Sequence, residues 1–408
     1  MDLLHPRAAG IDISKRDAKV AIRVQSEGGK VSTQVTTWGS MTGQVLELAD
    51  FLRSQGVTTV VMEATSDYWK PFYYPMEATG LPVMLVNARQ ARNIPGRKSD
   101  VSDAAWLADL GAHGLLRASF VPAPDIRRLR DLTRARQMLV HDRTRVKQRL
   151  EKSLESSGTK LSVVVADLNG VSARRMLDAL VAGERDPRSL AALAHPRMRA
   201  TQDELAAALT GRFTEHDAFM VGQHLTHYDL LTGQIDALTA RIEEEIAPFR
   251  LARELLTTIP GIAEPTADVI IAETGGDMSI FPTAAHLASW AGVSPGMHES
   301  AGKRKSSTTR PGNRYLKEAL GNAASSNAKK GSNTYLARRQ RRISARRGKM
   351  RALVATEHAI LTAVWNMLSR GEAFTDLTPP PANTERQKKS HLRALEHLGY
   401  KVTLAPAA

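Results

Sequence analysis

The sequence predicts an α/β N-terminal domain, a long helical coiled-coil middle and a mainly α-helical C-terminal domain. Three observations lead to this fold class: short apolar runs that alternate with helical stretches, two long amphipathic helices, and apolar helical stretches on either side of a Pro-Gly turn. A chain of 408 residues has room for several cores. The expected divisions are 1–120, 121–250, 251–370 and a linker and tail over 371–408.

The N-terminal part begins with three β-like runs, AAGIDIS, AKVAIRV and VSTQVTT, which turn or polar residues separate. A helical stretch (GQVLELADFLRSQG) and a buried-looking strand (TTVVME) follow, and then a helix, a short strand (LPVMLV) and a helix that starts near Ser99. Strands that come first as hairpins and then alternate with helices indicate a mixed sheet flanked by helices, as in ribonuclease H-like folds.

The middle part contains two amphipathic helices, over about 126–154 and 225–246, with apolar residues at three- and four-residue steps. The second spacing is close to a heptad, so we expect an antiparallel pair or an intersubunit coiled coil, about 35–45 Å long. The segment 160–220 between them looks helical.

The C-terminal region over about 255–368 opens with LLTTIPGIAEPTADVIIAETG and ends in a helix over 351–368. Its Pro-Gly turn has two interpretations. It is either a packing turn between helices or a hairpin whose following helix N-terminus offers backbone N–H groups to a phosphate. The run PPPANTERQKKS, after Thr378, is expected to be a linker.

The composition limits the class of protein. The chain is 42% hydrophobic and 24% charged, as in ordinary folded proteins, and no apolar run approaches the length of a membrane span. The start, MDLLHPRAAG, lacks a signal-peptide pattern, so we expect a cytoplasmic protein without a membrane partner. Because the chain has no cysteine, any metal must be held by oxygen or imidazole ligands.

The formal net charge of +14 indicates a polyanionic partner. The segment 303–351 holds sixteen Lys or Arg residues and one acid, Glu318. A solvated face or a disordered tail is the ordinary interpretation of such a run, but apolar and aromatic residues are interleaved with the charges here. They are Tyr315, Leu316, Leu320 and Tyr335. The sequence therefore predicts a folded nucleic-acid-binding region.

Four acids are candidate metal ligands. Asp12 and Glu63 end two predicted strands, in GIDIS and VVMEAT, and Asp100 and Asp103 lie three apart near a helix N-terminus in RKSDVSDAAWLADL. Carboxylates suit Mg²⁺ or Mn²⁺, and a pair of such ions about 4 Å apart stabilises the attacking and leaving oxygens in phosphodiester transfer. Each acid alone has an ordinary alternative, as a helix cap or a surface residue.

GIDIS with a following hairpin also resembles the phosphate loop of actin-like kinases. Those kinases need Gly-rich phosphate and adenosine loops later in the chain, and this sequence has none of the right kind. A basic C-terminal region has no role in a small-molecule kinase either, so chemistry on a nucleic acid is favoured.

The succession GIDISK, VVMEAT and RKSDVSDA resembles the DEDD transposases of bacterial insertion sequences, the family called insertion sequence one-ten. LLTTIPGIAEPTADVIIAETG, FPTAAHLASWAGVSPGMHESAGK and RPGNRYLKEAL are similar to the family's second conserved domain. The resemblance implies a RuvC-like nuclease domain in which Asp12, Glu63, Asp100 and Asp103 bind Mg²⁺ or Mn²⁺. It also implies a serine nucleophile at Ser300, in HESAGK.

The family further implies donor and target DNA as substrates, a structured non-coding guide RNA, and a homo-oligomer (dimer or tetramer) with composite active sites. Lys303, Arg310 and Arg314 are close to the serine in sequence and are expected to clamp phosphates. Three nearby serines, Ser294, Ser306 and Ser307, are alternative candidates for the nucleophile. His298 is a candidate base for Ser300, and a neutral loop histidine is the ordinary interpretation of it. The resemblance does not extend over 375–408.

Two alternative functions remain at this point. One is a hydrolytic junction nuclease that uses only the four acids. The other is a non-catalytic scaffold that binds RNA or DNA through the basic segment and the coiled coil.

Overall fold

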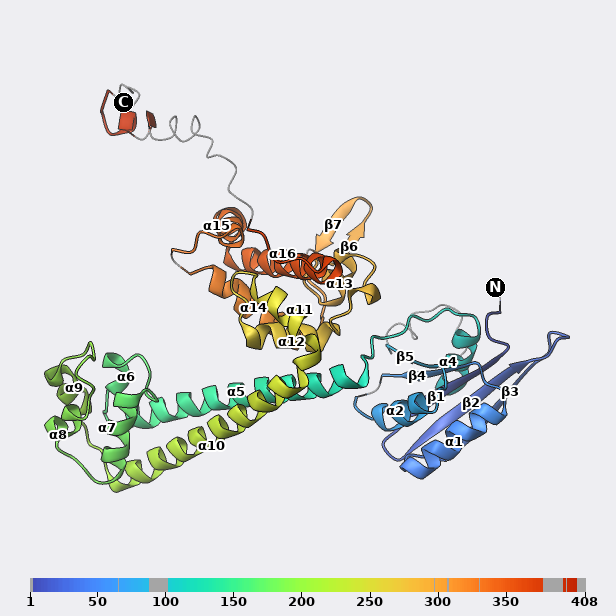
Figure 1. Ribbon diagram of the computed structural model, residues 1–408, viewed down its shortest axis with the longest axis horizontal. Helices are drawn as coiled ribbons and strands as arrows, with labels where there is room; N and C mark the ends of the chain where they lie inside the picture. The colour runs from blue at the N-terminus through green and yellow to red at the C-terminus, as the bar shows by residue number, and fades with distance from the viewer. Residues whose placement is uncertain are drawn as a thin grey trace. The chain divides into compact units, whose positions relative to one another are not determined.

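The computed structural model divides the chain into two compact units, Met1–Pro122 and Ala123–Ala408, and each is described in turn (Figure 1). The structure describes residues 3–64, 66–87, 102–296, 298–306, 308–329, 331–376, 392–393 and 395–401. Within these ranges, only the backbone is described for residues 298–300 and 303–306.

The first unit is built on a five-stranded mixed sheet, as expected. Its strands lie in the order β3-β2-β1-β4-β5, with antiparallel pairing from β3 to β1 and parallel pairing from β1 to β5. The strands are β1 (Arg7–Ile13), β2 (Asp17–Gln25), β3 (Val31–Gly39), β4 (Thr59–Glu63) and β5 (Val83–Val86). The helices are α1 (Thr42–Ser54), α2 (Lys70–Ala78) and α4 (Asp103–Ala112).

The two faces of this sheet have different coverings (Figure 1). Ile11 and Met62 face α1 and α2 and share a core with their apolar residues. Alternate strand residues face α4, where Val61 packs against Leu107. The described part of α4 begins at Asp103, after the cap Ser102, whereas the sequence indicated a start near Ser99; residues 88–101 lie outside the described chain.

The second unit begins with α5 (Pro124–Ser156), which packs along α10 (Glu215–Glu245). Their direction is antiparallel, because Arg128 near the start of α5 pairs with Glu245, and Arg143 further along donates to Thr232 at 3.3 Å. An antiparallel pair within one chain was one of the two expected arrangements. α10 starts at residue 215 rather than 225, because a capping box at Thr214 extends it.

Four short helices connect this pair and share an apolar core with the adjoining ends of α5 and α10, which confirms the helical expectation for 160–220. They are α6 (Leu161–Val164), α7 (Val171–Val181), α8 (Pro187–Ala192) and α9 (Gln202–Leu209).

The rest of the second unit is mainly helical, as predicted, but it includes a two-stranded ribbon that the sequence analysis did not predict. Its core includes the buried face of α16, which lies between Gly348 and Gly371, two glycines with positive φ, and is longer than the expected 351–368. The elements are η1 (Ala247–Phe249), α11 (Arg250–Thr257), α12 (Glu264–Thr274), η2 (Met278–Ile280), α13 (Ala284–Trp290), β6 (His298–Ser300), β7 (Lys303–Ser306), α14 (Arg314–Asn327), α15 (Tyr335–Arg347) and α16 (Lys349–Arg370).

No helix in the described ranges combines the length and apolar character needed to cross a membrane. The domain divisions expected at residues 120, 250 and 370 stay predictions. The predicted linker PPPANTERQKKS, after Thr378, lies outside the described residues.

Candidate active site

Asp12 and Glu63 lie at the same corner of the sheet. β1 and β4 are parallel neighbours, and Ile11 is level with Met62, so the next residues on the two strands are Asp12 and Glu63. Since Ile11 and Met62 face α1 and α2, the two acids share the opposite face, which α4 covers. Parallel pairing thus brings two carboxylates from distant parts of the sequence to one strand-end corner.

Asp103 joins this corner from α4. It is the first residue of the helix, and its neighbour Ala104 lies directly on the backbone of β1, where a Cβ on Gly10 would stand 2.0 Å from the Ala104 carbonyl oxygen. Burial raises the pKa of Asp12, and the negative charge of Asp103 raises it further. Lys19, the cross-strand neighbour of Asp12 on β2, acts in the opposite direction. Asp12 and Asp103 are therefore close enough for their negative charges to repel one another.

The fourth predicted acid, Asp100, lies outside the described residues. Within the described ranges, no group of three or more His, Asp or Glu side chains is assembled for a metal ion. The donor chemistry nevertheless fits Mg²⁺ or Mn²⁺. Asp12 and Asp103 supply hard oxygen atoms, and a divalent cation beside them would offset the repulsion that raises the pKa of Asp12.

Ser300 belongs to the β6–β7 ribbon. It pairs with Lys303 across the turn Ala301–Gly302, where both φ angles are positive (51° and 70°), as a two-residue hairpin turn requires. The base of the ribbon is held by the Gly296 amide, which donates to the Thr308 carbonyl at 2.9 Å. The predicted nucleophile and one predicted phosphate-binding residue are thus placed opposite each other beside a tight turn.

The other predicted residues near the serine have different positions. Ser294 precedes the ribbon, His298 and Ser306 are paired within it, and Ser307 lies outside the described residues. His298 and Ser300 thus lie two residues apart on the same strand, β6, and the structure adds nothing to what their sequence spacing indicated.

Arg310 and Arg314 follow the ribbon and are exposed. Arg310 reaches the Ser289 hydroxyl at 3.5 Å. Arg314 is the first residue of α14, where its guanidinium donates to the Tyr315 hydroxyl at 2.7 Å and lies 4.7 Å from the centre of that ring. Both side chains keep N–H donors available for phosphate oxygens.

A buried carboxylate missed in the sequence analysis ties the start of α14 to α5. Glu273, on α12, is fully buried and accepts hydrogen bonds from Arg134 at 2.6 and 2.7 Å. It also accepts one from Asn313, whose own oxygen caps α14 through the Tyr315 and Leu316 amides. An acid after the apolar run DVIIA was the available signal, because a buried charge needs a partner.

The Pro-Gly turn between α11 and α12 packs closely against α14. Gly261 has φ +90°, and a Cβ there would stand 2.5 Å from the Asn327 amide nitrogen, which donates to the Pro260 carbonyl. These contacts support the packing interpretation of the turn.

Comparisons with known proteins match the segment with the four acids and, separately, the segment with Ser300. An IS110 DEDD family model described as "Transposase" matches residues 9–158, which include the four acids. A second model, described as "Transposase IS116/IS110/IS902 family", matches residues 253–340, which include Ser300, Lys303, Arg310 and Arg314.

Two curated relatives are similar. The "Insertion element IS110 uncharacterized 43.6 kDa protein" of Streptomyces coelicolor is 35% identical over 148 residues, and the match covers 35% of each chain. The "Insertion element IS900 uncharacterized 42 kDa protein" of Mycobacterium paratuberculosis is 26% identical over 344 residues, 78% of this chain and 84% of the relative. The chain thus spans about a third of the first relative and most of the second. With the two ordered model matches, these similarities show that the chain belongs to the IS110 family of insertion-sequence transposases.

Proposed function

We propose that this protein is a DNA transposase that cuts and rejoins DNA through a covalent serine–DNA intermediate. Ser300 is the nucleophile, and Asp12, Glu63, Asp100 and Asp103 are the metal-binding acids of an RNase H-like (RuvC-like) domain. The position of Asp12 and Glu63 at one corner of the sheet, with the charge of Asp103 acting on Asp12, carries the proposal. The sheet supports the domain type, since three antiparallel strands continue into a parallel pair with helices on both faces.

The serine step conserves the number of phosphodiester bonds. The Ser300 Oγ bonds to the scissile phosphorus while its proton passes to a base, and the leaving nucleotide oxygen departs and takes up a proton. Attack by a DNA hydroxyl on the serine–phosphate ester reverses these events, so rejoining needs no ATP. A bound Mg²⁺ or Mn²⁺ supplies positive charge against the phosphate oxygens. Lys303, Arg310 and Arg314 neutralise the neighbouring phosphates.

The partners we propose are donor and target DNA, a structured non-coding guide RNA and further copies of this chain in a dimer or tetramer. The acids lie in the first compact unit and the serine in the second. A composite site that takes the acids from one subunit and the serine from another is compatible with this division, and the family resemblance supports it.

A trapped intermediate tests the mechanism. The full chain is incubated with labelled, nicked DNA from the end of its insertion element, in the presence of Mg²⁺ and the RNA transcribed beside the gene. We expect an adduct that survives denaturation, with the DNA on Ser300 by mass spectrometry. Ser300→Ala should abolish it, and Ser294→Ala should retain it. An adduct that persists in Ser300→Ala refutes the serine assignment, and cleavage without any adduct establishes the hydrolytic nuclease instead.

The acids are tested separately. Asp12→Ala and Glu63→Ala should abolish cleavage and adduct formation while DNA binding is retained, because the acids act on the reacting phosphate and not on the rest of the DNA. Transposition at the wild-type level in both variants would favour the non-catalytic scaffold.

A further inference from the structure

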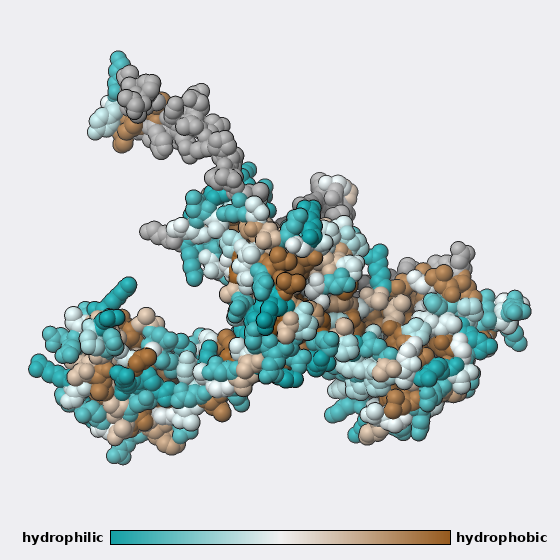
Figure 2. Space-filling view, viewed as in Figure 1, coloured by the Kyte–Doolittle hydropathy of each residue, from teal (hydrophilic) through white to brown (hydrophobic). Residues whose placement is uncertain are grey.

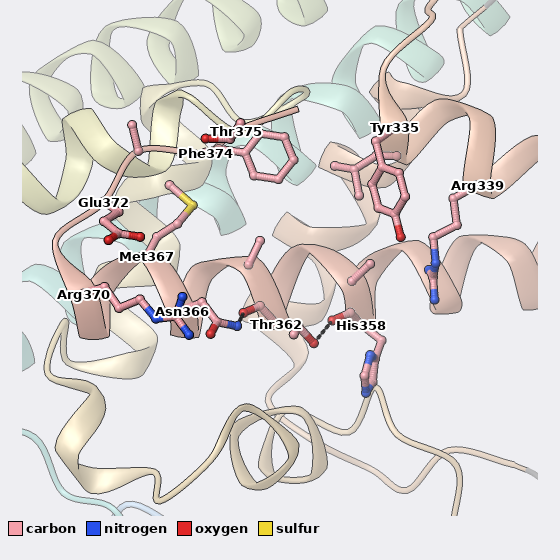
Figure 3. Close-up of a pocket in the computed structure, with 14 residues that line it drawn as sticks. Tyr335, Arg339, His358, Thr362, Asn366, Met367, Arg370, Glu372, Phe374 and Thr375 are labelled. Atoms are coloured by element: carbon pink, nitrogen blue, oxygen red, sulfur yellow. Dashed lines mark hydrogen bonds between the residues drawn. The ribbon is translucent and has the colours of Figure 1, made fainter. Parts of the chain in front are cut away.

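α15 is an arginine-rich helix with two unlike faces. Six of its thirteen residues are arginine. Leu336, Ala337 and Gln340 are buried against the rest of the unit. Figure 3 shows Tyr335 and Arg339 of α15 beside α16, and the Arg339 guanidinium donates to the Ala355 carbonyl at 2.5 Å. The inner face of α15 is therefore fixed on α16.

The outer face carries Arg341, Arg342 and Arg346, which are all exposed. At 100° per residue the three lie within an arc of about 140°, opposite the buried residues. Within the described ranges, none of the three takes part in a hydrogen bond or ion pair. Some exposed arginines elsewhere do have such partners; Arg241, for example, pairs with Glu244 and Glu245.

No carboxylate is available nearby in the sequence either. The chain has no acidic residue between Glu318 and Glu357. Gly348, with φ +86°, ends α15 and starts α16, and exposed Lys349 and Arg351 follow it. Several like charges on a rigid support repel one another, so this face is suited to an anion that spans more than one of them.

We propose that the outer face of α15, defined by Arg341, Arg342 and Arg346, grips the backbone of double-stranded DNA without reading its bases. The inference rests on the proposed function in taking DNA as the substrate. Arginine forks match phosphate oxygens, and 341 and 346 are about 7.5 Å apart along the helix axis, so their side chains reach different phosphates. Phosphate contacts of this kind set register and not sequence preference.

The neighbouring side chains favour a DNA duplex over other nucleic acids. Ile343 and Ser344 are half-buried and Ala345 is small, so this face offers no exposed aromatic ring on which unpaired bases would stack. The major groove of B-form DNA admits an α-helix between its two backbones, whereas the deep, narrow major groove of A-form RNA does not.

Two charge-matched variants of the full chain test the proposal. The face variant is Arg341→Gln/Arg342→Gln/Arg346→Gln. The control is Arg175→Gln/Arg197→Gln/Arg199→Gln, three exposed arginines in the region of α7 to α9. Both lower the formal net charge from +14 to +11. Glutamine has nearly the helix propensity of arginine, and circular dichroism confirms the fold.

Binding to a labelled DNA duplex of random sequence is followed by fluorescence anisotropy over a range of salt, in EDTA so that cleavage does not enter. Each lost phosphate contact lowers the log–log salt slope by about 0.9, so the face variant should be shallower than wild type by about 2 to 3. The control should keep the wild-type slope. A version with Arg341, Arg342 and Arg346 changed to Lys should keep the slope, because charge is preserved.

An unchanged slope in the face variant, or an equal loss in the control, would overturn the proposal. So would a loss of affinity for an RNA duplex that leaves DNA affinity intact. These outcomes are independent of the serine mechanism. An adduct that persists in Ser300→Ala overturns the serine mechanism, but it does not change the salt dependence of DNA binding measured in EDTA.

Discussion

Gly10 sets the distance between β1 and α4, and with it the position of Asp103 relative to Asp12. A Cβ at residue 10 would stand 2.0 Å from the Ala104 carbonyl oxygen and 2.4 Å from the Ala108 amide nitrogen, both in the α4 backbone. Ordinary contact begins at 3.4 Å, so Gly10→Ala must push the helix away by more than an ångström. Such overpacking costs about 1–3 kcal/mol of folding free energy.

The effect on catalysis should exceed the effect on stability. Asp103 directly precedes Ala104, so it moves with the displaced helix. A misplacement of about 1 Å lowers a rate on the order of a hundredfold. We therefore expect Gly10→Ala to slow adduct formation about a hundredfold in single-turnover assays at saturating Mg²⁺, while circular dichroism shows a folded chain.

Gly111→Ala is the matched control. It lies near the opposite end of α4 from Asp103, and its added Cβ would meet the Val61 side chain at 2.6 Å. A side chain yields more easily than backbone, so this variant should lose some stability and keep a rate close to wild type. A folded Gly10→Ala protein that reacts at the wild-type rate would refute the link between helix spacing and catalysis.

Three further predictions concern buried charge. Asp12→Asn should abolish cleavage yet raise the Tm at pH 7. The pKa of Asp12 is raised by burial and by Asp103, so its stabilising protonated form is lost as pH rises above the ordinary value of 3.8; an unchanged or lower Tm would contradict this. Burial raises the pKa of Asp268 to about 6, although Arg253 lies beside it, with its Nε 2.9 Å from Oδ1 and its Nη2 donating to Oδ2 at 3.3 Å. This pKa is roughly two units above 3.8, so wild type should lose about 2.4 kcal/mol of unfolding free energy relative to Asp268→Asn between pH 4 and pH 7.5. Urea unfolding measures this difference, and a pH-independent one would show that the pKa is ordinary. Glu273→Gln leaves the half-buried Arg134 without its counter-charge and should cost about 3 kcal/mol in the same assay; a loss below about 1 kcal/mol, as for a surface pair, would mean that the network is not needed for stability.

The sequence analysis anticipated the order of most elements, because strand and helix periodicities are local. The apolar alternation around Asp12 and Glu63 placed both at strand ends, and the 3-4 spacing in 126–154 predicted α5 closely. The predicted start of α10, at about residue 225, was wrong, because the capping box at Thr214 lies outside the strongly apolar stretch. The β6–β7 ribbon was missed, since its few polar residues have no apolar alternation and it depends on positive φ at Ala301 and Gly302.

By itself, the sequence determined the class of protein and its candidate chemistry, through ordered motifs with acids, a serine and an excess of cations. Only the tertiary structure decided which of these groups meet. The parallel register of β1 and β4 and the absence of a side chain at Gly10 bring Asp12, Glu63 and Asp103 to one corner. Among the described cations, the contacts also decided that Arg341, Arg342 and Arg346 on α15 remain without counter-charges. The reason is physical: burial and pairing depend on residues that are distant in the sequence and adjacent only in the folded chain.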